Sequence, residues 1–138
     1  PYFDDFVNIC VSVLDSFNLG DRLIVQSFDE RALSYMHIKY PHLILSYLVG
    51  GGEVEWLEND EMDFDRIIGK IGFYPEWFSP ANIFVTKSNV DEAHRRGMKV
   101  VTWTPDEKDE MQRLIDCGVD AIISNYPDRL LEVVKNQK

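Results

Sequence analysis

Apolar residues recur along the chain in two alternating arrangements, short continuous runs and patterns with steps of three and four positions. The stepped pattern over residues 3–17 predicts an amphipathic helix that ends before Gly20. The run at 23–28 is apolar at most positions and predicts a buried strand. Asp29 is a suitable N-cap for the next helix, which Pro41 ends. The inward residues of the first helix are expected to be Phe3, Phe6, Val7, Cys10, Leu14 and Phe17.

The alternation of strand and helix continues to the C-terminus. Further strands are expected at residues 43–49, 99–104 and 120–124. A fifth, short strand within the aromatic segment 73–84 is left open. The intervening helices are expected near 67–71 and 88–96, from an N-cap at Asp106 to Gly118, and around 130–134.

Strands that are continuous apolar runs and alternate with helices indicate an α/β protein with a parallel sheet. Two architectures fit this order. One is a small doubly wound domain with flavodoxin-like strand order. The other is part of a TIM (β/α)8 barrel, which takes about 250 residues when complete. The periodicity leaves both open.

Composition narrows the function classes. The chain has 138 residues, 45% of them hydrophobic, which suffices for the core of one domain. Its net charge of −10 argues against a nucleic-acid partner, because phosphates would repel it. No apolar run reaches the roughly 18 residues of a membrane span.

Cys10 and Cys117 are expected to be small buried side chains and not a disulfide. The start at Pro1 suggests part of a longer protein.

Several segments of the sequence are distinctive enough to be compared with the motifs of a known protein family. They read LIVQSFDERAL (23–33), AHRRG (93–97), VVTWT (100–104), CGVDAIIS (117–124) and NYPDRLL (125–131). In this order and spacing they resemble the C-terminal end of the glycerophosphodiester phosphodiesterase family. The resemblance implies a TIM barrel of the phospholipase-C-like phosphodiesterase type. Residues 1–138 would then be a single partial domain, the C-terminal half of that barrel.

The resemblance also implies a reaction, the hydrolysis of a small-molecule glycerophosphodiester to glycerol 3-phosphate and an alcohol. An anionic phosphodiester calls for a cation and two proton-transfer groups around phosphorus. The family carries these groups in its N-terminal half, so no catalytic residue and no metal ligand is expected in this chain. A divalent cation, Mg²⁺ or Ca²⁺, is expected for the full-length enzyme, and the chain alone is expected to be inactive.

The same resemblance assigns the substrate-binding wall. Active sites of such barrels lie at the C-terminal ends of the strands. Trp103 ends a predicted strand and is expected to line the pocket, together with Phe28, Ser27 and Asn125. A plain core tryptophan that plugs the end of the barrel is the competing interpretation for Trp103.

Two stretches depart from the family pattern. The family usually has Trp-Thr-Val-Asn where this chain has Trp103, Thr104, Pro105 and Asp106. It usually has Thr-Asp-Tyr-Pro where this chain has SNYP at 124–127. The second departure removes a carboxylate from the mouth of the barrel, which leaves substrate preference and activity open.

Other candidate residues have simpler interpretations. His94 lies in a last helical turn, where it is expected to stabilise free carbonyls and the helix dipole. His37 and His42 are expected at the surface, and three histidines without shared spacing do not indicate zinc. The acidic segment 53–65 has Arg66 where a calcium-binding EF-hand loop needs glycine, so a solvated loop leading into a helix is expected.

Three hypotheses follow. The chain is the C-terminal part of a phosphodiesterase whose partner is the missing N-terminal half. Alternatively, it is a non-catalytic half barrel that self-associates, with two open sheet edges that a homodimer could close into an eight-stranded structure. The third, a doubly wound ligand-binding domain, lacks a glycine-rich phosphate loop, because GGG at 50–52 leads into an acidic stretch.

Overall fold

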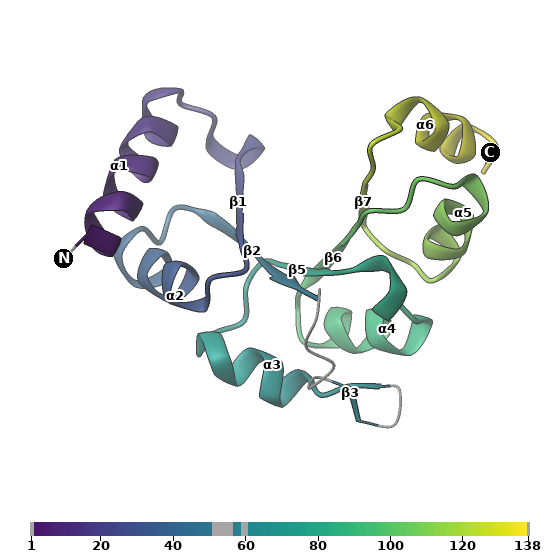
Figure 1. The fold of residues 1–138 in the computed structure, drawn as a ribbon, viewed down its shortest axis with the longest axis horizontal. Helices are drawn as coiled ribbons and strands as arrows, with labels where there is room; N and C mark the ends of the chain where they lie inside the picture. The colour runs from purple at the N-terminus through teal and green to yellow at the C-terminus, as the bar shows by residue number, and fades with distance from the viewer. Residues whose placement is uncertain (1, 51–56, 59–60, 138) are drawn as a thin grey trace.

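The computed structural model describes residues 2–50, 57–58 and 61–137, and its main feature is one sheet of five parallel strands. The strands follow each other in chain order across the sheet, and each pair of neighbours is parallel. The sheet bends into an arc that is open between its first and last strands (Figure 1). The strands are β1 (Ile24–Ser27), β2 (Ile44–Val49), β5 (Trp77–Pro80), β6 (Lys99–Trp103) and β7 (Ala121–Ile123).

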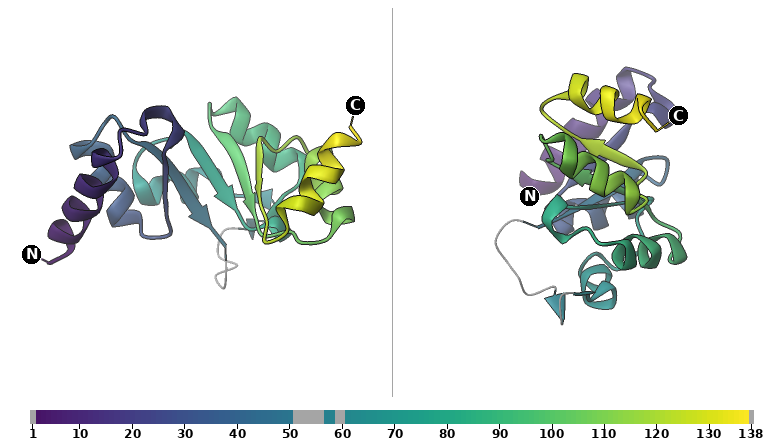
Figure 2. Two further views of the ribbon diagram at one scale, coloured as in Figure 1. Left: turned by 90° about the horizontal axis from the view of Figure 1, so that it is seen from above. Right: turned by 90° about the vertical axis from the view of Figure 1, so that its right-hand side faces the viewer.

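The described residues form six α-helices, which lie on the convex side of this arc, and the two termini lie at its opposite ends (Figures 1 and 2). Helices on one face only, around a curled sheet, are the arrangement of a barrel and not of a doubly wound domain. The prediction of a partial TIM barrel is therefore confirmed. The helices are α1 (Tyr2–Ser16), α2 (Glu30–Lys39), α3 (Phe64–Ile71), α4 (Lys87–Arg95), α5 (Lys108–Asp116) and α6 (Pro127–Lys135), with short 3₁₀ turns η1 (Gly20–Arg22) and η3 (Asn82–Phe84).

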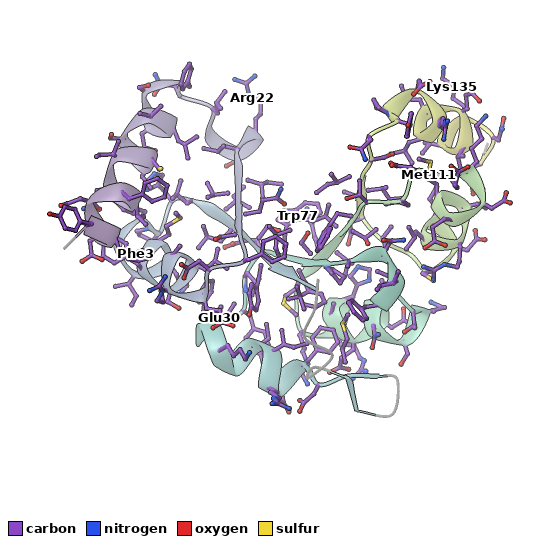
Figure 3. All side chains as sticks on the ribbon, viewed as in Figure 1. Phe3, Arg22, Glu30, Trp77, Met111 and Lys135 are labelled. Atoms are coloured by element: carbon purple, nitrogen blue, oxygen red, sulfur yellow. The ribbon has the colours of Figure 1, made fainter. Side chains whose placement is uncertain are left out.

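The core lies between the sheet and the helices. Side chains alternate between the two faces of a strand, so Leu45, Tyr47 and Phe78 face the helices and are fully buried. The alternate positions face the concave side, where Figure 3 shows Trp77. This concave surface is the inside of the barrel.

The sequence left the existence of one strand open and did not predict a small hairpin. The open question in the aromatic segment is answered by β5, which pairs with both β2 and β6. Within the acidic segment, β3 (Leu57–Glu58) and β4 (Glu61–Met62) form a small antiparallel hairpin where a loop was expected. Residues 53–56 and 59–60 of the predicted solvated loop lie outside the described residues. Asp63 caps α3 by accepting a hydrogen bond from the Arg66 amide.

The first helix buries only part of the face that was expected, with Val7 buried and Phe3, Cys10 and Leu14 half-buried. Val7 and Val11 are its buried residues, whereas Phe6 and Phe17 are each 66% exposed. The steps of three and four were read correctly as a helix, but α1 lies at one end of the arc and contacts α2 on one side only. Several of its apolar residues therefore have no neighbour among the described residues to cover them.

Of the two helix N-caps predicted, at Asp29 and Asp106, one is confirmed and one is wrong. Asp29 caps α2 as predicted, accepting a hydrogen bond from the Arg31 amide at 2.9 Å. The prediction that Asp106 caps α5 is wrong, because the N-cap is Glu107, which makes no side-chain cap bond. Cys10 and Cys117 are half-buried free thiols.

Candidate functional site

The candidate site lies where the five strands end. In a parallel sheet all C-terminal strand ends meet at one edge, which in a barrel is the mouth that holds the active site. Trp103 is the last residue of β6, Phe28 follows β1, and Asn125 comes two residues after β7. The sequence prediction named these three positions, and the fold brings them to the same edge.

Trp103 is held in place by two contacts. Its indole Nε1 donates a hydrogen bond to the Ser79 carbonyl oxygen of β5 at 3.0 Å. Its ring meets the Phe28 ring edge to face, with centroids 5.5 Å apart and an interplanar angle of 89°. Strands β2 and β5 lie between β1 and β6 in the sheet, so this aromatic contact spans the concave side of the arc.

The two rings form a partly open apolar surface at the mouth. Phe28 is 55% exposed and Trp103 is half-buried, so both have ring area left for another molecule. Ser27 lies beside them in the chain, and its hydroxyl oxygen accepts a hydrogen bond from the Asp29 amide at 2.9 Å. The Ser27 hydroxyl proton remains available as a donor.

Asn125 contacts Asp106, which was expected from the sequence to cap the following helix. The Asp106 carboxylate accepts hydrogen bonds from the Asn125 side-chain amide at 2.9 Å, the Asn125 backbone amide at 3.0 Å and the Ser124 hydroxyl at 3.1 Å. These bonds, that of the Asn125 side chain foremost, lower the pKa of Asp106 below its usual value. Only the fold shows that residues 106 and 125, 19 positions apart, share one contact.

The histidines lie in separate pairs on the surface. His94 contacts Asp120 at 2.8 Å, so it bonds a carboxylate as well as ending a helix. His42 contacts Asp15 at 2.9 Å, and His37 stacks on Phe73 with centroids 3.9 Å apart. Across the part of the chain that the structure describes, no three His, Cys, Asp or Glu side chains gather closely enough to hold a metal ion.

No helix among the described residues is long and apolar enough to cross a membrane.

A curled sheet of five parallel strands with helices on its outer side is the architecture of part of a (β/α)8 barrel. The sequence model of the glycerophosphoryl diester phosphodiesterase family matches residues 2–129. The chain belongs to this family.

Two relatives agree with the family assignment, and a solved structure agrees with the fold. A glycerophosphodiester phosphodiesterase of Caldanaerobacter subterraneus is 28% identical over 126 residues, covering 91% of this chain and 47% of its own. One of Bacillus altitudinis is 25% identical over 125 residues, covering 91% and 48%. The crystal structure of a glycerophosphodiester phosphodiesterase from Parabacteroides distasonis superposes with a TM-score of 0.75 at 21% identity, covering 96% of this chain and 51% of its own. The chain thus spans about half the length of the relatives it matches.

Proposed function

We propose that this chain is the C-terminal portion of a metal-dependent glycerophosphodiester phosphodiesterase, which hydrolyses a glycerophosphodiester to glycerol 3-phosphate and an alcohol. Its role is to supply one wall of the substrate pocket, formed by Trp103, Phe28, Ser27 and Asn125. The aromatic contact across the concave side carries this proposal, because it presents flat apolar area at the edge where barrels bind substrate. Such rings suit the carbon skeleton of the glycerol or alcohol group, while Ser27 and Asn125 offer hydrogen bonds to its oxygens.

The reaction itself needs groups that the proposal assigns to an N-terminal half. A divalent cation, Mg²⁺ or Ca²⁺, would offset the charge of the phosphodiester and polarise it there. The described residues of this chain offer no cluster of ligands for that ion. The work left to them is to bind and orient the substrate and to exclude water from one side of it.

The number of strands favours the N-terminal half over a second copy as the partner. The described residues form a sheet of five strands, and a barrel of this type has eight. Three more strands would close it, whereas two copies would bring ten. Two copies would also bring together chains of net charge −10 each, which opposes association at low ionic strength.

The exposed apolar residues lie where the proposed partner would attach. Strands β1 and β7 each pair on one side only within the sheet, so each offers an open edge. Most of the exposed large apolar side chains belong to the elements beside these two edges. They are Tyr2, Phe6, Ile9 and Val13 on α1, Phe17 directly after it, Ile24 and Phe28 at β1, and Ile123, Tyr126, Leu131 and Val134 at β7 and α6.

The same edges support the alternative, a non-catalytic half barrel that self-associates. The unpaired backbone groups of β1 and β7 would then bond to those of another copy. Sedimentation over a range of protein concentrations and salt separates the two. A dimer that persists in low salt favours the alternative, and a monomer with a cooperative unfolding transition counts against it.

The test of the enzyme proposal uses the pure 138-residue chain with glycerophosphocholine and either Mg²⁺ or Ca²⁺. We expect no turnover by the chain alone. We expect turnover when a second polypeptide that carries the first three strands of a family member is added. Turnover by the chain alone would contradict the assignment of the catalytic groups. Binding of the two polypeptides without turnover would contradict the assignment of the activity.

A further inference from the structure

The contact between Asp106 and the turn after β7 joins two loops at the mouth. Asp106 lies in the loop between β6 and α5, and Ser124 and Asn125 lie between β7 and α6. One carboxylate oxygen accepts from the Ser124 hydroxyl and the Asn125 backbone amide, and the other accepts from the Asn125 side chain. Arg129 supports the contact from α6, donating to the Asp106 backbone carbonyl at 2.9 Å.

The charge of Asp106 decides which way the Asn125 amide points. An ionised carboxylate only accepts hydrogen bonds, so the NH₂ group of Asn125 must face it. The carbonyl oxygen of the same amide is then left for other partners, and Asn125 is exposed. An exposed carbonyl oxygen accepts from a hydroxyl and repels a phosphate oxygen.

We propose that Asp106 is a positioning residue that ties the loop after β6 to the loop after β7 and orients the Asn125 amide with its carbonyl oxygen toward the mouth. If the proposed function holds, Asn125 meets a hydroxyl of the glycerol or alcohol group and not the phosphate. The positioning of Asn125 does not depend on that function, because it follows from contacts within this chain.

The geometry also predicts that the two side chains can be exchanged. Asparagine at 106 would use its carbonyl oxygen to accept from the Ser124 hydroxyl and the backbone amide of residue 125. Its NH₂ group would donate to an aspartate at 125. Each hydrogen bond across the contact would then keep a donor and an acceptor, with one carboxylate in the pair as before. The two departures from the family pattern, at 106 and 125, would then be a single exchange of the two side chains and not two independent changes.

The experiment compares four variants of the 138-residue chain: D106A, N125D, the exchanged double variant D106N/N125D, and D29A. Backbone and side-chain amide exchange is followed by NMR near neutral pH, and stability by urea unfolding. D29A removes the N-cap of α2, away from this contact, so it shows how exchange at Asn125 responds to a loss of stability elsewhere.

We expect D106A to speed exchange of the Asn125 backbone amide by about tenfold or more, while the amide of Val100, the second residue of β6, changes no more than in D29A. N125D places two carboxylates in contact and should be less stable than the wild type. The exchanged variant should recover at least about half of the stability that N125D loses. Unchanged Asn125 exchange in D106A, or an exchanged variant no more stable than N125D, would overturn the proposal. These outcomes do not depend on turnover, so they are separate from the test of the enzyme.

Discussion

Replacing Gly50 by alanine should destabilise the chain at the edge that carries the candidate site. Gly50 follows β2 with φ of +127°, a backbone conformation that side-chain-bearing residues rarely adopt. A Cβ there would lie 2.8 Å from the Ala81 Cβ and 3.2 Å from Cε2 of Phe84. The first distance is too short for two carbon atoms in contact, so the loops after β2 and β5 would have to separate.

The cost has two parts. Holding a non-glycine residue in a sparsely populated backbone region costs about 1–3 kcal/mol. Forcing an extra methyl into a filled contact costs roughly 1–3 kcal/mol more. Because a shift of either loop relieves part of both, we expect G50A to lose about 3 kcal/mol in the free energy of unfolding.

Urea unfolding followed by circular dichroism measures this loss, and two variants separate its parts. Gly20 also has positive φ, +53°, but a Cβ there would have no atom within 4 Å. G20A therefore reports backbone strain alone, which we expect to cost about 1 kcal/mol. The double variant G50A/A81G removes the Ala81 methyl and should be more stable than the sum of its single changes predicts. A loss below about 0.5 kcal/mol in G50A would refute the close approach of the two loops.

Three further changes test other parts of the structure. W103F keeps a ring beside Phe28 but removes the indole donor to the Ser79 carbonyl, and should cost about 0.5–1.5 kcal/mol by urea unfolding. L33A removes a fully buried side chain of α2 and should cost about 2–5 kcal/mol, while I38A, on the exposed side of the same helix, should change stability by less than about 0.5 kcal/mol. Hydrogen bonds lower the folded-state pKa values of Asp29, Asp106 and Glu110 below their unfolded values of 3.8 to 4.5. The stability that these carboxylates contribute is therefore present above the unfolded pKa values and is lost as the pH falls through the folded-state pKa values. The urea midpoint should therefore drop between pH 5 and pH 3, and less so in the D29N/D106N variant.

The repeating units of the fold could be predicted because each has its own local signal. A buried parallel strand needs apolar residues on both faces, and the helix after it needs one apolar stripe and a cap, as at Asp29. The strand at 77–80 was harder to recognise, because it is short and contains Pro80, which cannot donate to a neighbouring strand. The hairpin at β3 and β4 has only two residues in each strand, too few for a period of two to be visible.

The buried face of α1 could be predicted only in part from its own pattern. Its apolar residues extend over more than one face, and which of them are covered depends on the helices beside it. In this chain α2 covers one side, leaving Val7 and Val11 buried and Phe6 exposed. A hydrophobic pattern reports what a residue can bury, whereas the number of neighbouring elements decides what it does bury.

The candidate site shows the same division between local and distant information. The family pattern and the rule for barrel mouths predict Trp103, Phe28 and Asn125 as candidates, because each lies just after or at the end of a strand. The two contacts that give these residues their geometry join positions far apart in the chain, Phe28 to Trp103 and Asp106 to Asn125. Asp106 was misread because an aspartate before a helix is usually a cap. Its loop instead brings it to the next strand end, where three donors converge on it, and Glu107 takes the cap position without a side-chain bond. At a barrel mouth, a polar residue between strand and helix can therefore serve the neighbouring loop instead of its own helix, and the geometry of adjacent strand ends decides between the two.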